Sequence, residues 1–222
     1  MVLDEKPVIF VIDDDPSIRD ALRGLFRAVA LNAQMFASPR EFLHADRPDA
    51  PSCIVLDVKL PNTDGLTFQS ELAKSNVQLP IIFITGHGDI PMSVRAIKAG
   101  AVDFLTKPFS EQDLLGAIDL GVRRDRIRRQ NAISAGKLLQ RFVSLSPRER
   151  EVMAQVVRGQ MNKQIAASLG LSEIMIKVYR GQMMRKMQAT SLTELLQIAG
   201  QLRQAADQDP TILMTLDQGV HS

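Results

Sequence analysis

Short, wholly apolar runs alternate with helix-forming stretches over the first 120 residues, and this alternation limits most strongly what the chain can fold into. The runs fit strands at residues 8–12, 53–56, 81–84 and 102–105, with a weaker one at 33–36. Between them, apolar residues recur every three to four positions, as Ile18, Leu22 and Leu25 do, which is typical of amphipathic helices. Because strands that are apolar on both faces need helices on both sides, we expect an α/β domain with a five-stranded parallel sheet and five helices.

The pattern becomes wholly helical from residue 145. Ser146, Pro147 and Glu149 form the signature of a capping box at a helix start. Further helices are expected at 162–169, 173–187 and 191–202, and a tight turn containing Gly170 joins the first two of these. Two helices joined by a short turn with glycine follow the helix-turn-helix plan. The second half therefore predicts an all-α, four-helix domain.

The boundaries we expect are a first domain at 1–122, a helical linker at 123–142, a helix-turn-helix domain at 143–206 and a C-terminal tail at 207–222. The linker begins with an arginine-rich run at 123–129. This run fits either a solvated charged helix or a direct contact with DNA. The helix through the linker is expected to be either continuous or broken near Gly136.

The net charge of +2 divides unevenly along the 222 residues. Residues 1–120 hold 11 Lys and Arg against 17 Asp and Glu, whereas residues 121–222 hold 16 against 8. Only the second half therefore suits a polyanion, although a solvated basic face has the same composition. A single cysteine, Cys53, excludes an intrachain disulfide. No apolar run approaches the roughly 18 residues of a membrane span, so we expect a cytoplasmic protein with no membrane partner.

Polar side chains directly follow four of the predicted strands: Asp13, Asp14, Asp15, Asp57, Thr85 and Lys107. Carboxyl ends of parallel strands share one edge of the sheet, where open α/β sheets bind ligands. Clustered carboxylates repel one another unless a cation lies among them, and Mg²⁺, a hard ion with oxygen ligands, fits best. A carboxylate beside such an ion can attack phosphorus. Lys107 and the Thr85 hydroxyl then suit the oxygens of the transferred group.

These segments resemble the receiver domain of bacterial two-component response regulators over about residues 7–122. The matching motifs are Val11-Ile12-Asp13-Asp14-Asp15, Leu56-Asp57, Ile84-Thr85-Gly86 and Thr106-Lys107-Pro108-Phe109. The resemblance implies a flavodoxin-like fold in which Asp57 takes a phosphoryl group from a sensor histidine kinase. It also implies that Mg²⁺ is held by Asp13, Asp14, Asp57 and the backbone carbonyl of Lys59.

The receiver resemblance implies two further features. Thr85 and Phe104 form a switch pair, in which the hydroxyl moves to the phosphoryl group and the ring turns inward. The peptide before Pro108 is cis, which positions Lys107. The run Thr85-Gly86-His87-Gly88-Asp89-Ile90-Pro91-Met92 is similar to the FixJ branch, and His87 is interpreted as a spacer or solvent gate.

Residues 143–203 resemble the LuxR/FixJ-type helix-turn-helix. The resemblance rests on Leu145-Ser146-Pro147-Arg148-Glu149-Arg150-Glu151-Val152, Asn162-Lys163-Gln164-Ile165-Ala166, Leu169, Lys177, Arg185-Lys186-Met187 and Ser191-Leu192. Met175 and Tyr179 stand where that family usually has Thr and often has His. The expected DNA contacts are Asn162, Lys163, Ser172, Ile174, Lys177, Val178, Arg180, Gly181 and Arg185.

The third helix of this domain can also be interpreted from its periodicity. At about 100° per residue, Ile176, Met183 and Met187 share a core face. Lys177 and Val178 lie on the opposite side, where they reach guanine and the thymine methyl group in the major groove. Gly181 on that side lets the backbone approach the DNA. Arg180 lies at the edge of the core face and is expected to contact phosphate. On the last helix, the apolar face with Leu192, Leu195, Leu196 and Ala199 serves either a dimer or its own domain.

The order of the two resemblances is the whole-chain plan of a FixJ/NarL-type transcriptional regulator. Such a regulator forms a homodimer when phosphorylated, binds double-stranded promoter DNA and RNA polymerase, and commonly activates transcription. Its only chemistry is Mg²⁺-dependent self-phosphorylation and slow autodephosphorylation, so we expect no enzyme. Two alternatives remain open at this point. Asp13-Asp14-Asp15 also satisfies the Asp-x-Asp of haloacid-dehalogenase phosphatases, with Asp13 as nucleophile, and a DNA binder with a vestigial receiver shares the same domain order.

Overall fold

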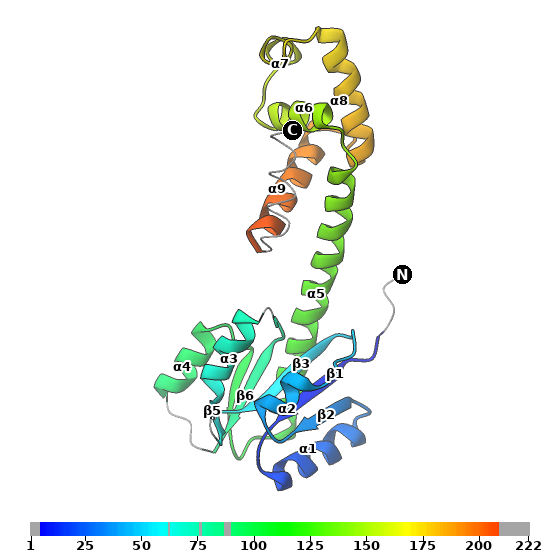
Figure 1. Cartoon of the computed structure of the whole chain (residues 1–222). Coiled ribbons are helices and arrows are strands. Elements are labelled where there is room, and N and C mark those ends of the chain that lie inside the picture. Colours follow the sequence, from blue (N-terminus) through cyan, green and yellow to red (C-terminus); the bar gives the residue numbers. More distant parts are fainter. Residues whose placement is uncertain (1–4, 62, 76, 87–89, 209–222) are drawn as a thin grey trace. The chain divides into compact units, whose positions relative to one another are not determined.

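The computed structural model of the chain describes residues 5–61, 63–75, 77–86 and 90–208 (Figure 1). The chain divides into two compact units between Arg129 and Gln130. The first unit contains the strands, and the second contains helices only over its described residues. Among the described helices, none is both long enough and apolar enough to cross a membrane.

A parallel five-stranded sheet forms the centre of the first unit, in the order β2-β1-β3-β6-β7. Its strands are β1 (Val8–Ile12), β2 (Asn32–Phe36), β3 (Ser52–Asp57), β6 (Ile81–Thr85) and β7 (Asp103–Thr106). All five expected strands are present, and all residues of β1, β3 and β6 are buried. The register sets Asp57 beside Ile84 and Thr85 beside Thr106. The strand ends that carry the polar residues therefore meet at one edge.

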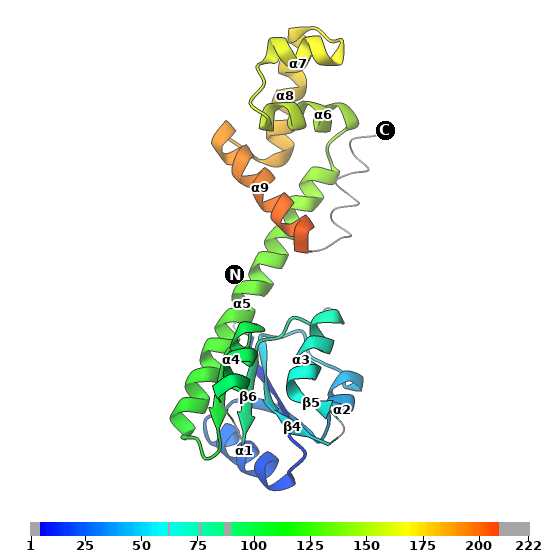
Figure 2. The same cartoon turned by 90° about the vertical axis from the view of Figure 1, so that its left-hand side faces the viewer.

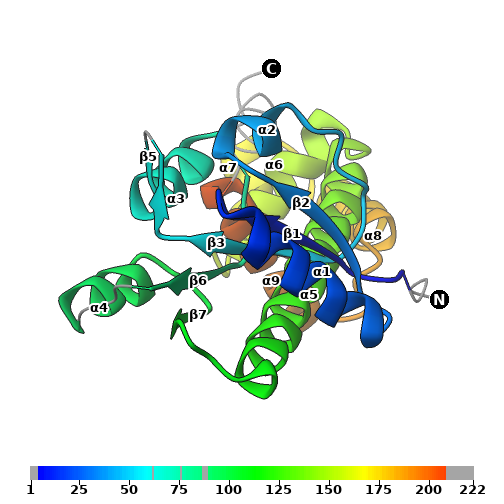
Figure 3. The same ribbon diagram turned by 90° about the horizontal axis from the view of Figure 1, so that it is seen from below.

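Helices cover both faces of this sheet, as the view from below in Figure 3 shows. They are α1 (Pro16–Ala28), α2 (Pro39–His44), α3 (Gly65–Lys74), α4 (Ile90–Lys98) and the first part of α5 (Glu111–Val143). One apolar cluster joins α1 and α5 to the sheet through Phe26 and Ile118, and the other joins α2 and α3 to it through Phe42 and Phe68. Neither α2 nor the short antiparallel pair β4 (Lys59–Leu60) and β5 (Thr63–Asp64) was located from the sequence.

The helix α5 is continuous from Glu111 to Val143, so the break considered near Gly136 does not occur. Its arginine-rich run is neither a freely solvated stretch nor available in full to DNA. Asp125 is fully buried and its Oδ2 accepts from the Ser52 N–H at 3.0 Å, while Arg129 pairs with Asp49. These side chains attach the helix to the first residue of the central strand β3 and to the segment before it.

The second unit consists of the end of α5 followed by α6 (Pro147–Val157), α7 (Asn162–Leu169), α8 (Glu173–Met187) and α9 (Leu192–Gln208) (Figure 2). The predicted capping box is present: the Ser146 Oγ accepts from the Glu149 N–H, and the Glu149 carboxylate accepts from the Ser146 N–H at 2.7 Å. Gly170 ends α7 at φ 64°, a left-handed conformation that glycine adopts at little cost. The turn before α8 is therefore built as the sequence predicts.

The core of the second unit confirms the expected faces of α8. Ile176, Met183 and Met187 are fully buried. On α9 the apolar face divides: Leu195 is buried in the same core, whereas Leu196 is 43% exposed. The helix also runs on to Gln208, beyond its expected end at residue 202.

Candidate functional site

Three carboxylates converge at the edge of the sheet where β1 and β3 end. Oxygen atoms of Asp13, Asp14 and Asp57 all lie within 4.8 Å of one another. The Asp13 side chain is fully buried, Asp57 is 8% exposed and Asp14 is exposed. The adjacent strands force this approach, because Ile12 and Leu56 stand side by side just before the acidic residues.

Lys107 joins two of these carboxylates. Its Nζ donates to Asp13 Oδ2 at 2.8 Å and to Asp57 Oδ2 at 2.7 Å. The Lys107 N–H donates to the Thr85 carbonyl at 2.7 Å, which ties the lysine to the end of β6. The Lys107-Pro108 peptide is cis, as the receiver resemblance implies.

Burial and pairing act against each other in this cluster. Burial raises the pKa of Asp13 above its ordinary value, although the hydrogen bonds from Lys107 and the Asp15 N–H oppose the shift. Burial lowers the pKa of Lys107, but its bonds to Asp13 and Asp57 outweigh this and leave that pKa raised. The ammonium group is thus held charged among the carboxylates, as expected where like charges need a cation.

Backbone contacts fix the acidic residues in place. Asp57 Oδ1 accepts from the Lys59 N–H at 2.9 Å, and Asp13 Oδ1 accepts from the Asp15 N–H at 2.9 Å. Arg19 Nη1 donates to the carbonyls of Asp13 and Asp14 at 2.7 and 2.8 Å. No sequence motif pointed to Arg19, which lies one helical turn after the acidic motif.

Gly65 is a second residue that sequence reasoning missed. A Cβ atom built there lies 2.7 Å from the Asp57 carbonyl oxygen and 3.0 Å from the Val58 Cα. Both atoms belong to the backbone, so a side chain at this position displaces the strand end that carries Asp57. An Asp-Gly pair such as Asp64-Gly65 is typical of a turn, but nothing in the sequence reveals this contact.

Thr85 and Phe104 lie on the neighbouring strands β6 and β7. Thr85 is fully buried at the end of β6. Phe104 is half-buried, and its ring centroid lies 6.2 Å from that of Phe83, its neighbour across the strands. His87 lies outside the described residues.

The donor set suits Mg²⁺. This ion prefers carboxylate and carbonyl oxygens and keeps several waters, and the cluster offers three carboxylates at one edge. Lys107 bonds to one carboxylate oxygen of Asp13 and to one of Asp57. The carboxylate of Asp14 is exposed to solvent. The residues present therefore fit the ion.

The second unit presents a surface of a different kind on α8. Ser172 caps the helix, its Oγ accepting from the Met175 N–H. Ile174 is 74% exposed and Val178 is 46% exposed. The other expected contacts with exposed side chains or backbone are Lys163, Lys177, Gly181 and Arg185.

Arg180 and Asn162 differ from these exposed residues. Both are half-buried, and Arg180 Nη1 donates to Asn162 Oδ1 at 3.0 Å. This bond holds α8 against the start of α7. It brings together two residues that sequence reasoning treated as separate DNA contacts.

Family models match both units of the chain. The response regulator receiver domain matches residues 9–119, and the model of bacterial regulatory proteins of the luxR family matches residues 143–199. The chain is a two-component response regulator that controls transcription. Both family resemblances of the sequence analysis, and the α/β fold followed by an all-helical domain, are confirmed. The two family matches make the chain a response regulator with a DNA-binding domain and not a classical enzyme, so the phosphatase alternative is wrong.

Relatives match along most of the response regulator. Nodulation protein W of Bradyrhizobium diazoefficiens is 52% identical over 87% of this chain and 86% of that protein. Response regulator protein TodT of Pseudomonas putida is 43% identical over 92% and 90%. Among solved structures, the response regulator StyR is 44% identical, with a TM-score of 0.75 over 88% of this chain and 98% of that one. Full-length FixJ from B. japonicum is 38% identical, with a TM-score of 0.54 over 89% and 97%.

Proposed function

We propose that Asp57 is the phosphoacceptor of this response regulator. The observation that carries the proposal is the position of its carboxylate, which ends the central strand within 4.8 Å of Asp13 and Asp14 and is bonded to Lys107. Asp13 is fully buried, whereas Asp57 keeps 8% of its surface exposed to an incoming phosphoryl group. The partner that supplies this group is a sensor histidine kinase.

In the transfer, an Asp57 carboxylate oxygen attacks the phosphorus of a phosphohistidine. The P–O bond to Asp57 forms as the P–N bond breaks, and the electron pair returns to the imidazole nitrogen of the kinase. Asp13, Asp14, Asp57 and the Lys59 carbonyl would hold Mg²⁺, which would supply positive charge for the phosphoryl oxygens. Lys107 exchanges its bond with Asp57 for one with a phosphoryl oxygen. The same site accounts for self-phosphorylation from small phosphodonors and for slow autodephosphorylation.

The phosphoryl group then draws the Thr85 hydroxyl toward it, and the Phe104 ring turns inward. We infer that this change favours a homodimer that sets two copies of α8 on successive half-sites of promoter DNA. Lys177 and Val178 read bases, Arg185 lies on the same groove-facing side, and Lys163 and Arg180 contact DNA phosphates. RNA polymerase is the further partner, and activation is the proposed outcome. A regulator of promoter DNA acts in the cytoplasm of a bacterium.

Asp57→Asn tests the assignment. With acetyl phosphate and Mg²⁺, we expect the wild-type chain to form an acid-stable, base-labile phosphoprotein and Asp57→Asn to form none. Asp64→Asn is the matched control, because Asp64 is a nearby exposed carboxylate whose role as the cap of α3 is retained by Asn. Labelling of Asp57→Asn at the wild-type rate contradicts the proposal.

A further inference from the structure

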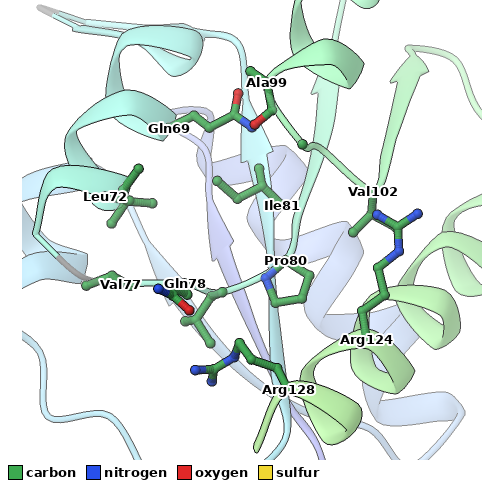
Figure 4. Close-up of a pocket in the computed structure, with 13 residues that line it drawn as sticks. Gln69, Leu72, Val77, Gln78, Pro80, Ile81, Ala99, Val102, Arg124 and Arg128 are labelled. Carbon is green, nitrogen blue, oxygen red and sulfur yellow. The ribbon is translucent and has the colours of Figure 1, made fainter. Parts of the chain in front are cut away.

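Two parts of the receiver domain carry arginine side chains to which the phosphoacceptor chemistry gives no role. One is a pocket of about 280 Å³ at the start of β6, with Arg124 and Arg128 on opposite sides of Pro80 (Figure 4). Arg128 is bonded to Asp125, and the two guanidinium groups do not converge on one point. The other is Arg19 on α1, a single side chain that contacts two residues of the acidic cluster. Arg19 therefore has the more definite structural role.

Asp14 is the member of the carboxylate cluster whose own side chain does not account for its position. Its carboxylate lies within 4.8 Å of those of Asp13 and Asp57, and like charges at this distance repel one another. Lys107 bonds to the other two carboxylates. No ion pair of Asp14 occurs within the described part of the chain. Something other than a side-chain cation therefore holds Asp14 against this repulsion.

Arg19 holds the backbone of the acidic loop 13–15. Its Nη1 donates to the carbonyl of Asp13 at 2.7 Å and to that of Asp14 at 2.8 Å. The Asp13 N–H in turn donates to the Phe36 carbonyl at 3.2 Å. Arg19 is half-buried, and no carboxylate pairs with it among the described residues. Its charge is therefore directed at the two carbonyls, which fixes the peptide groups from which the Asp13 and Asp14 side chains extend.

We propose that Arg19 is a positioning residue for the metal-binding carboxylates and that it acts mainly through Asp14. This inference rests on the proposed Mg²⁺ site, because it concerns the residues that would hold the ion. Hydrogen bonds from a charged donor are stronger than neutral ones, so Arg19 offsets part of the repulsion that would move Asp14 away from its neighbours. The carboxylates are then gathered in advance, and the free energy of binding the ion does not include the cost of gathering them.

The sign of the effect on Mg²⁺ affinity distinguishes positioning from a simple charge effect. Arg19 places a positive charge near a site for a divalent cation, so removing that charge alone would reduce repulsion and strengthen Mg²⁺ binding. Loss of positioning has the opposite sign, because Asp14 is then free to move away. A purely structural role for Arg19 would lower the free energy of unfolding and leave the Mg²⁺ affinity of the folded chain unchanged.

Calorimetric titration of the full-length chain with MgCl₂, without a phosphodonor, measures this affinity. Arg19→Met keeps an unbranched, helix-favouring side chain but has no donor, and we expect it to bind Mg²⁺ about tenfold more weakly than the wild type. Arg19→Lys should stay within about threefold of the wild type, because one ammonium group can donate to both carbonyls. Arg23→Met is the matched control: it removes the same charge from the same helix, but Arg23 pairs with the exposed Asp20.

A double-mutant cycle tests whether Arg19 acts through Asp14. Asp14→Asn removes one charge from the metal site and should weaken Mg²⁺ binding by itself. Adding Arg19→Met to Asp14→Asn should then weaken binding by less than about threefold, because substitutions that act through the same contact are not additive.

Three results would each overturn the proposal: Mg²⁺ binding by Arg19→Met as tight as by the wild type or tighter, equal losses in Arg19→Met and Arg23→Met, or an undiminished loss from Arg19→Met in the Asp14→Asn background. None of them affects the assignment of Asp57, which phosphorylation of Asp57→Asn decides. Absence of saturable Mg²⁺ binding by the wild type would overturn both this inference and the metal site of the proposed function.

Discussion

The acidic pocket of the receiver domain and the exposed face of α8 both use charged side chains, but they hold them in opposite states. In the pocket, Asp13 is fully buried and already bonded to Lys107. On α8, Lys177 is exposed and has no ion-pair partner among the described residues. A reaction that creates and moves charge needs groups fixed in advance, whereas a surface that meets DNA needs donors left free for bases and phosphates.

The environments explain why the two arrangements differ in energy. A buried charge has lost its hydration and depends on the interaction with its partner. Removing one member of such a pair therefore leaves the other charge buried without a counter-charge. A charge at the surface is screened and contributes little to stability. Two lysine-to-alanine substitutions should therefore act on different properties of the protein, one mainly on folding and the other on recognition.

The largest change in stability is expected for Lys107→Ala. This substitution leaves the carboxylates of Asp13 and Asp57 without their cation, and losing one member of a buried charged cluster costs about 3 kcal/mol or more. Urea unfolding of the receiver domain without divalent ions measures this loss. Because the metal site is expected to hold Mg²⁺, added Mg²⁺ should recover more stability in the variant than in the wild type. Equal stability of the two chains without Mg²⁺ would show that the pairing contributes nothing.

Gly65→Ala should produce the next effect. The new Cβ atom meets backbone at 2.7 and 3.0 Å, so we expect a loss of about 2 kcal/mol from forced displacement. Phosphorylation by acetyl phosphate should slow as well, because the displaced atoms belong to Asp57 and Val58. Gly24→Ala in the middle of α1 is the control: nothing lies within 4 Å of its Cβ, and Ala should stabilise that helix by about 0.5–1 kcal/mol. Equal effects of the two substitutions would contradict the contact.

The difference between Gly65 and the acidic residues shows what the sequence can reveal. Asp13 and Asp57 were predicted because apolar runs fix where strands end, and parallel strands bring those ends together. The contact of Gly65 with the Asp57 carbonyl depends on how α3 approaches β3, which no local pattern records. Short elements were missed for a related reason, since α2 has only six residues, of which Pro39 and Phe42 are buried.

Asp125 illustrates the same limit in the linker. The run 123–129 is dominated by arginine, so its composition indicated a solvated or DNA-binding helix. The buried Asp125 pairs with Arg128 on its own helix and accepts a hydrogen bond from the Ser52 N–H, 73 positions earlier in the chain. Periodicity predicts which face of a helix is apolar, but it does not reveal a buried carboxylate that accepts a hydrogen bond from a distant backbone group. The continuity through Gly136 has a simpler cause, because glycine in a helix costs only about 1 kcal/mol relative to Ala.

Glu149 is a second buried charge that we expect to stabilise the fold. It lies in the second unit, away from the acidic pocket of the receiver domain. Burial raises its pKa, but the bonds from Lys186 Nζ and the Ser146 N–H outweigh burial and leave the pKa below its ordinary value. A lowered folded-state pKa gives stability that is present above the unfolded value near 4.5 and lost as the pH falls through the folded value.

We therefore expect Glu149→Gln to destabilise the second unit by about 1 kcal/mol at pH 7, a charged hydrogen bond discounted for the 40% exposure of Lys186. The difference from wild type should shrink as the pH falls below 4.5. Unfolding followed at a series of pH values checks this, and a difference that stays constant down to pH 3 would show that the ionised carboxylate is not the cause. Glu173→Gln, at an exposed first-turn position of α8, is the control.

The smallest change in stability, within about 0.5 kcal/mol, is expected for Lys177→Ala, because the side chain is exposed. Its effect should appear in DNA binding instead. Lys177 lies opposite the buried Ile176–Met183–Met187 face, so Lys177→Ala should cost about 1–3 kcal/mol at the cognate site and little on scrambled DNA. Lys163→Ala, at the exposed start of α7, should weaken both DNAs nearly equally and lower the log–log salt slope by about one.

Binding curves on cognate and scrambled duplexes at several salt concentrations separate these two roles. If Lys177→Ala lowers both affinities in parallel, Lys177 contacts phosphate, and base reading passes to Val178 and Arg185 on the same exposed side. The contrast with Lys107 survives that outcome, since an exposed lysine that contacts phosphate still acts on binding rather than on folding. It fails only if Lys177→Ala destabilises the second unit as strongly as Lys107→Ala destabilises the first, because exposure would then no longer separate the two kinds of charge.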